Sequence, residues 1–125
     1  MNVAYVDTSC LVAIAFGEKG APALARRLQR FQRLVASSLA EAELRSAFVR
    51  EGRAWEPALL DRVAWVVPDR PLSAEIEAVL ATGYLRGADC WHLAAALYLA
   101  GDPKLLAFVT LDRTQAAVAR ALGFK

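Results

Sequence analysis

Short apolar runs alternate along this chain with longer segments that have helical periodicity. Several of these runs are apolar at nearly every position, which is typical of strands buried on both faces of a parallel sheet. The runs at residues 3–6, 34–36, 65–67 and 106–110 are therefore predicted to be strands, and Phe124 allows a fifth short one.

Helices are predicted between these strands and after the last one. Gly52 is placed to end one helix, and Pro22 suits the first turn of another. The segment 88–100 is apolar on nearly every side, which predicts a central, buried helix. The predicted helices cover residues 10–16, 23–31, 39–50, about 57–63, 72–85, 88–100 and 114–122. Alternating strands and helices of this kind predict an α/β protein, a parallel sheet covered by helices on both faces. Residues 1–125 are expected to form a single domain.

Composition narrows the possibilities. A hydrophobic fraction of 57% argues against disorder. The net charge of +2 is not that of a strongly basic nucleic-acid-binding domain, so any RNA binding must use local basic clusters. The densest such cluster is Arg26, Arg27, Arg30 and Arg33, for which a solvated helix face is the favoured interpretation.

The cysteines and the apolar runs bear on location. Cys10 and Cys90 have neither metal-site nor disulfide-framework spacing, which favours free, buried thiols in a reducing compartment. The apolar run at residues 10–16 is too short and lacks the preceding basic residues of a signal peptide. No run reaches the ~20 apolar residues of a membrane span. We therefore expect a cytoplasmic protein without membrane association.

Acidic residues lie where the chain leaves the predicted sheet. Asp7 ends the first strand, Asp112 follows the last strong strand, Asp89 opens the central helix, and Glu43 lies in the helix after the second strand. Ligands of such folds bind beyond the carboxyl ends of the strands. Taken singly, Asp7 and Asp89 could be helix N-caps, and Asp112 with Gln115 has capping-box spacing. Together, however, the four carboxylates would repel one another unless a cation lay between them.

Glu43 is preferred to its neighbour Glu41 as a ligand. Ser38 and Glu41 have the spacing of a capping box, and Arg45 follows Glu41 by one helical turn, so Glu41 has a structural role on the solvent side. Glu43 shares its helix face with apolar residues, where a carboxylate is unfavourable without a compensating partner.

A site made of carboxylates suits a hard divalent cation, Mg²⁺ or Mn²⁺. Zinc is disfavoured because His92 is the single histidine and neither cysteine is suitably placed. A divalent ion can activate a bound water and stabilise a leaving oxygen, so the predicted reaction is phosphodiester hydrolysis.

Four segments together resemble a known family. VDTS at Asp7, AEAEL around Glu43, LRGADCWHLAAAL around Asp89 and FVTLD at Asp112 are similar to the motifs of PIN-domain ribonucleases, in particular the VapC-type toxins of toxin–antitoxin pairs. The resemblance covers essentially the whole chain, with the motifs in order. It implies a three-layer α/β/α sandwich with a central parallel sheet of four to five strands, which hydrolyses RNA as an endoribonuclease.

The resemblance also implies roles for individual residues. Asp7, Glu43 and Asp89 match the metal-binding acids for one or two Mg²⁺ or Mn²⁺ ions, and Asp112 matches a fourth, more variable acid. Supporting hydroxyls are implied at Thr8, Ser9 and Thr110. The implied partners are an RNA substrate, a second copy in a homodimer, and an antitoxin whose C-terminal arm often carries Arg and blocks the acidic pocket. Cys90-Trp91 departs from the usual small or aliphatic residues, so the pocket wall near Asp89 could differ.

Other interpretations remain at this stage. A catalytically silent PIN-like module could bind RNA or protein without cutting, although the presence of all four acids weighs against it. A receiver-type phosphoacceptor domain would need a Lys after the last major strand and a pair of acids after the first, and the sequence has neither. For His92, a structural hydrogen bond is favoured over a general-base role. Trp55 and Trp65 are predicted to be core or dimer contacts rather than base-stacking platforms.

Overall fold

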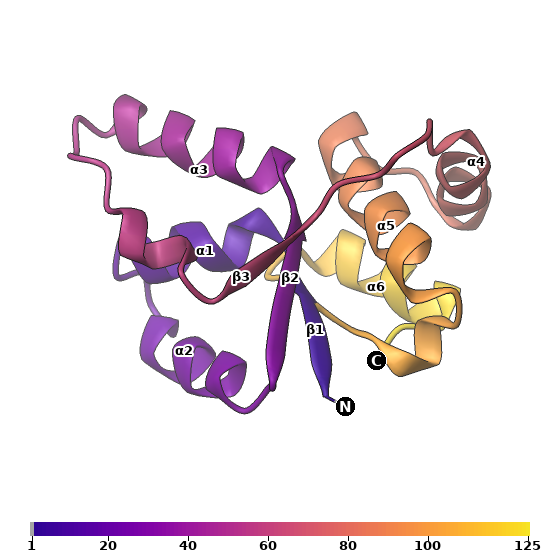
Figure 1. Ribbon diagram of the computed structural model, residues 1–125, viewed down its shortest axis with the longest axis horizontal. Helices are drawn as coiled ribbons and strands as arrows, with labels where there is room; N and C mark the ends of the chain where they lie inside the picture. The colour runs from indigo at the N-terminus through magenta and orange to yellow at the C-terminus, as the bar shows by residue number, and fades with distance from the viewer. Residues whose placement is uncertain (1) are drawn as a thin grey trace.

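A parallel sheet runs through the centre of the protein (Figure 1). The computed structural model describes residues 2–125. The sheet order is β3-β2-β1-β4, and each neighbouring pair is parallel. The strands are β1 (Val3–Val6), β2 (Arg33–Ser37), β3 (Val63–Val66) and β4 (Ala107–Val109). The first strand in the sequence is thus an interior strand, so its carboxyl end lies between those of β2 and β4.

Helices cover both faces of this sheet, which confirms the predicted α/β/α sandwich. In Figure 1, α1–α3 lie on one side of the strands and α4–α6 on the other. The helices are α1 (Thr8–Ala15), α2 (Ala21–Gln29), α3 (Leu39–Arg50), α4 (Ser73–Thr82), α5 (Gly87–Ala100) and α6 (Arg113–Leu122). Two 3₁₀ turns, η1 (Pro57–Leu60) and η2 (Pro103–Leu105), precede β3 and β4. No helix within residues 2–125 is long and apolar enough to cross a bilayer.

Each face of the sheet has its own hydrophobic core. Successive side chains of a strand point to opposite faces. Ala4 and Val6 accordingly pack with α1, α2 and α3 in the core on one face of the sheet. Tyr5, between them, packs with α5 in the core on the other face. All three residues are fully buried. Helix α5 is buried along most of its length, as its apolar sequence predicted.

The local predictions fail at several element ends. The predicted fifth strand at Phe124 is wrong, although the chain end runs beside β4. There, the Phe108 N–H donates to the Lys125 carbonyl (3.1 Å) and the Lys125 N–H donates to the Leu106 carbonyl (3.2 Å). The helix predicted at about 57–63 is a single 3₁₀ turn, and β3 begins at Val63 rather than at residue 65.

The predicted capping box at Ser38 and Glu41 is also wrong. Ser38 already has helical backbone angles, and its side chain makes no capping hydrogen bond. Instead, Ser37 Oγ accepts from the Leu39 N–H (3.1 Å). Glu41 nevertheless lies on the solvent side as expected, where it pairs with Arg45 Nε at 2.7 Å.

Candidate functional site

Asp7 lies at the carboxyl end of the interior strand β1. Its backbone N–H donates to the Val109 carbonyl (2.9 Å), which continues the pairing of β1 with β4 by one residue. Its carboxylate caps α1 by accepting from the Ser9 N–H at Oδ2 (3.1 Å). This bond starts α1 earlier than predicted, because the N-cap supplies a partner for an orphan backbone donor. The capping interpretation of Asp7 is therefore correct, and it fixes the carboxylate at the edge of the sheet.

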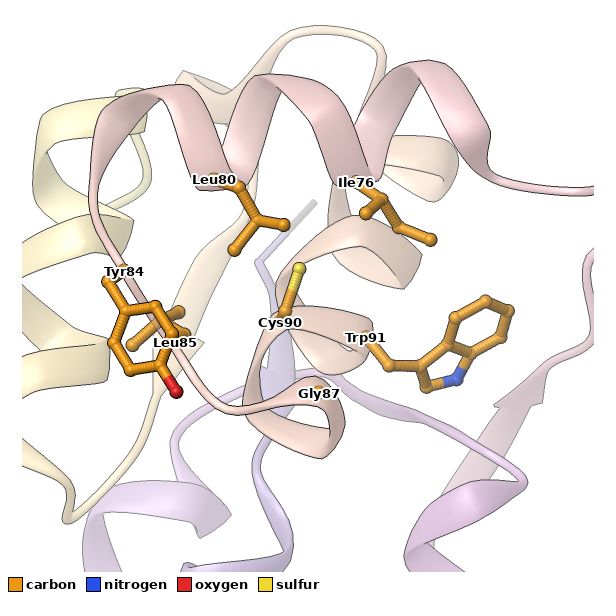
Figure 2. A pocket seen from close by; sticks show the side chains of 7 residues that line it. All are labelled: Ile76, Leu80, Tyr84, Leu85, Gly87, Cys90 and Trp91. Atoms are coloured by element: carbon orange, nitrogen blue, oxygen red, sulfur yellow. The ribbon is translucent and has the colours of Figure 1, made fainter.

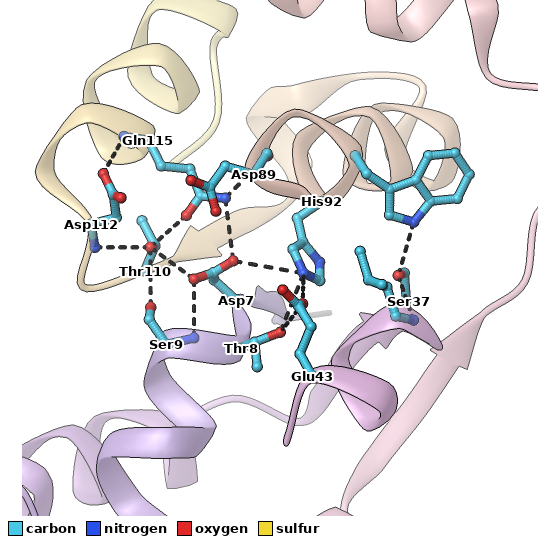
Figure 3. Close-up of polar contacts among 12 residues, drawn as sticks. Asp7, Thr8, Ser9, Ser37, Glu43, Asp89, His92, Thr110, Asp112 and Gln115 are labelled. Carbon is cyan, nitrogen blue, oxygen red and sulfur yellow. Dashed lines mark hydrogen bonds and ion pairs between the residues drawn. The ribbon is translucent and has the colours of Figure 1, made fainter. Parts of the chain in front are cut away.

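Gln115 holds the other side of the Asp7 carboxylate. Its carboxamide nitrogen donates to Asp7 Oδ1 (3.2 Å) and to the Asp89 backbone carbonyl (3.2 Å). Its carboxamide oxygen accepts from Thr110 Oγ1 (2.6 Å), and the side chain is fully buried. Gln115 therefore connects β1, the start of α5, and the turn between β4 and α6 (Figure 3).

Sequence reasoning gave Gln115 no role beyond the predicted capping box. Its backbone N–H does bond to Asp112 Oδ1 (2.9 Å), so Asp112 is the N-cap of α6. The Gln115 side chain turns inward instead of back to Asp112. A usable signal is present in the sequence, because Gln115 shares a helix face with Val118 and Ala119, both buried.

The hydroxyl residues tie the turn after β4 to the start of α1. Thr110 Oγ1 lies 3.3 Å from Asp7 Oδ2 and accepts from the Asp112 N–H (3.1 Å). Ser9 Oγ lies 3.4 Å from Thr110 Oγ1 and accepts from the Leu111 N–H (3.2 Å). Both hydroxyls thus act on backbone and side chains around Asp7.

Glu43 is held by a second set of donors. Its Oε1 is 2.7 Å from both Thr8 Oγ1 and His92 Nε2. The side chain of Glu43 is partly exposed, whereas that of His92 is almost fully buried. Burial acts to raise the pKa of the Glu43 carboxyl, but the hydrogen bonds from His92 and Thr8 outweigh it and lower that pKa. Glu43 is therefore stabilised as a carboxylate.

The four acids singled out in the sequence line one open pocket of about 460 Å³. Thr8 and Ser9 also line it, whereas Thr110 lies behind Asp7 and acts through its hydrogen bonds. Sequence reasoning missed Glu18, a further acid, and Arg50, the one basic side chain among the described residues that line this pocket. The residues lining it are Asp7, Thr8, Ser9, Val12, Glu18, Glu43, Ala47, Arg50, Asp89, Leu111 and Asp112.

Asp89 does not cap α5, so that alternative for it is wrong. The N-cap residue of α5 is Arg86, which makes no side-chain cap, and Asp89 lies within the first helical turn. Burial, followed by the charges of Asp7 and Asp112, raises the pKa of the Asp89 carboxyl. The charges of Asp7 and Asp112 thus lie near enough to disfavour the ionised state of Asp89, which is the condition that a cation relieves.

The donor set fits a hard divalent cation in its chemistry. It consists of carboxylate and hydroxyl oxygens, which suit Mg²⁺ or Mn²⁺. Within residues 2–125, however, no three His, Cys, Asp or Glu side chains are already grouped closely enough to chelate an ion. The pocket therefore suits an ion that keeps several of its waters and is bound by acids spread around the pocket, as Mg²⁺ commonly is.

The comparison with known families agrees with this geometry. The family model of the PIN domain matches residues 4–124, so the chain belongs to the PIN-domain family and has a nuclease-type fold. No curated protein and no solved structure gave a significant match.

The crowding of charge at Asp89 leads to a stability prediction. The folded state holds the Asp89 proton more tightly than the unfolded chain does, because the pKa of this carboxyl is raised. Ionising Asp89 at neutral pH therefore lowers the free energy of unfolding. Asp89→Asn should raise that free energy at pH 7 in EDTA, as measured by urea denaturation. The gain should fade as the pH drops through the raised pKa and vanish below ~3.9, the ordinary Asp value, since the wild type is then protonated in both states.

Asp61→Asn is the matched control, because Asp61 is exposed and lies outside the pocket. A loss of stability in Asp89→Asn at pH 7 would contradict the mutual repulsion of these acids.

Proposed function

We propose that this protein is a Mg²⁺- or Mn²⁺-dependent endoribonuclease, formed by one PIN domain over residues 1–125, and the toxin of a VapC-type toxin–antitoxin pair. The observation that carries the proposal is the convergence of Asp7, Glu43, Asp89 and Asp112 on one pocket of a nuclease-type fold. In this proposal Asp7, Glu43 and Asp89 bind the metal directly, and Asp112 acts as the fourth acid.

Each acid has a distinct task in the proposed reaction. A bound divalent ion would supply an activated water and neutralise the charge that develops on the leaving oxygen. Asp7 is held by hydrogen bonds from the Ser9 N–H and the Gln115 carboxamide, so it serves as the fixed anchor of the site. Asp89 and Asp112 face it from the starts of α5 and α6. Arg50, on the pocket rim, is placed to contact an RNA phosphate.

The alternative is a PIN-like module that binds RNA or protein without cutting. A silent site needs neither four carboxylates in one pocket nor the buried donors that orient them. All four acids line one pocket, and burial together with the charges of Asp7 and Asp112 raises the pKa of Asp89 there, a combination that is frequent in active sites. This observation favours the enzyme.

The proposed activity predicts metal-dependent cutting of RNA. Purified protein should cleave RNA with Mg²⁺ or Mn²⁺ and stop when EDTA is added. Asp7→Asn should slow cleavage by about 100-fold or more, the scale on which one preorganised active-site group contributes. The rate is measured on a 5′-labelled RNA in denaturing gels.

Asp61→Asn, whose side chain lies outside the pocket, should cut at the wild-type rate. Cleavage by Asp7→Asn at the parent rate would mean that the site is misassigned. RNA binding without any cleavage would support the silent module.

We also propose a homodimer and an antitoxin as protein partners. An apolar pocket of about 500 Å³ opens between α4 and α5, with Leu80 and Tyr84 on its rim (Figure 2). Tyr84 is 81% exposed and Leu80 is 45% exposed, an arrangement that a contact with a second copy would bury. The acidic pocket is complementary in charge to an Arg-bearing arm of an antitoxin.

The cysteines support a cytoplasmic location. Cys10 and Cys90 are free and buried. Burial raises the pKa of the Cys10 thiol to about 12, so this thiol stays protonated and unreactive. Unpaired thiols are typical of reducing compartments.

The dimer proposal predicts the effect of charge on the α4–α5 face. Light scattering coupled to size exclusion should give twice the monomer mass for the wild type. The double variant Leu80→Lys, Tyr84→Lys should give the monomer mass, because two buried charges without partners disfavour association. Val49→Lys, at an 80% exposed apolar position on α3, should remain dimeric. A monomeric wild type at high concentration would contradict the homodimer.

A further inference from the structure

A chain of hydrogen bonds runs from the backbone of β2 through the interior strand β1 to the rim of the acidic pocket. We propose that the Tyr5 hydroxyl holds Nδ1 of His92 and so turns Nε2 toward Glu43, and that His92 so held is a positioning residue for Glu43. The consequence for metal binding rests on the proposed function, whereas the hydrogen-bond pattern does not.

This series of hydrogen bonds begins at a group that can only donate. The Ser37 N–H donates to the Tyr5 hydroxyl oxygen (3.1 Å), because a backbone N–H only donates. The hydroxyl proton of Tyr5 must therefore point elsewhere. His92 Nδ1 lies 2.7 Å from the same oxygen and is the acceptor within reach.

This arrangement fixes which ring nitrogen serves Glu43. With Nδ1 engaged by Tyr5, Nε2 is the nitrogen that faces Glu43. Nε2 donates to Glu43 Oε1 at 2.7 Å, because a carboxylate oxygen only accepts.

Thr8 completes the hold on Glu43. Its hydroxyl donates to Glu43 Oε1 (2.7 Å), and its oxygen lies 3.2 Å from His92 Nε2. Both donors therefore reach the same carboxylate oxygen. In the described part of the chain no hydrogen bond reaches Glu43 Oε2, so this oxygen is available to a ligand.

The same hydrogen bonds exclude His92 as a general base. Its side chain is 1% exposed, Nδ1 is occupied by Tyr5, and Nε2 carries the proton that Glu43 accepts. No lone pair of the ring is left to take a proton from water. The role of His92 is thus to orient the Glu43 carboxylate, as a neighbouring hydrogen-bonding group does for a metal-binding side chain.

The first test reads the proton positions directly. His92 is the single histidine, so the side-chain imidazole signals of the labelled protein belong to it. Long-range ¹H–¹⁵N spectra of metal-free protein should show a proton on Nε2, the nitrogen that faces Glu43. In Tyr5→Phe the Nδ1 signal should shift, because its hydrogen-bond partner is gone. A wild-type spectrum without a proton on Nε2, or an Nδ1 signal that does not move in Tyr5→Phe, would overturn the proposal.

The second test reads metal affinity without relying on cleavage. Titration calorimetry with Mn²⁺ should show affinity about 10–100-fold weaker for His92→Leu, the usual effect of removing a group that orients a metal ligand. His92→Gln, whose amide can still donate near the position of Nε2, should recover most of the affinity. Tyr5→Phe should give a smaller loss than His92→Leu. Urea denaturation of each variant establishes that it is folded.

Cys90→Ala is the matched control, because Cys90 is buried on the same helix but faces the apolar pocket. Equal Mn²⁺ affinity in wild type, His92→Leu and His92→Gln would overturn the positioning role. An equal loss of Mn²⁺ affinity in His92→Leu and His92→Gln would mean that His92 acts only by packing, which would overturn the positioning role as well. If the wild type binds no Mn²⁺, the proposed function and the metal consequence both fail, while the nitrogen shifts still decide the hydrogen-bond pattern.

Discussion

Like-charge repulsion between carboxylates is the constraint on which the rest of this structure depends. Asp7, Asp89 and Asp112 come from three separate segments, yet burial and the charges of the other two raise the pKa of Asp89. Such crowding persists only when the surrounding fold holds the acids in place. The protein does so with hydrogen-bond donors. The Ser9 N–H and the Gln115 carboxamide hold Asp7, and His92 with the Thr8 hydroxyl holds Glu43.

The sheet topology makes this arrangement possible. Because β1 lies between β2 and β4, segments that follow all three strands meet at one edge. Successive side chains of β1 point to opposite faces of the sheet, so neighbouring residues have different roles. Tyr5 points into the α5 core and reaches His92, whereas Val6 packs on the other face and Asp7 leaves the sheet. The site is therefore built from the interior of the fold outward and depends on long-range contacts.

Much of the fold could be predicted from the sequence because it rests on local patterns. The bounds of α3 and β1 match the predictions, since apolar periodicity and turn residues define them. Glu43 was distinguished from Glu41 by helix face alone, and the Glu41–Arg45 pair and the pocket position of Glu43 agree with that reasoning. The ends of β3, and whether Phe124 forms a strand, depend on pairing with distant strands. Local sequence patterns do not encode such pairing.

The parts of the site that were missed are those made by distant pairs. Gln115 meets Asp7 across 108 residues, and Tyr5 meets His92 across 87, so neither contact leaves a short motif. Capping-box spacing explained Gln115 well enough to hide its second role. Acids at strand ends could be found because parallel topology brings strand ends together. The donors behind them could not be found, since their partners are fixed only by packing.

Anomalous diffraction at the manganese edge, from crystals grown with Mn²⁺, tests most directly the proposal that these acids hold a divalent ion. A peak within bonding distance of Asp7 and Asp89, bordered by Glu43 and Asp112, is the result that the account predicts. Crystals with an ordered acidic pocket and no manganese in it, or with manganese bound only elsewhere on the surface, would contradict the account.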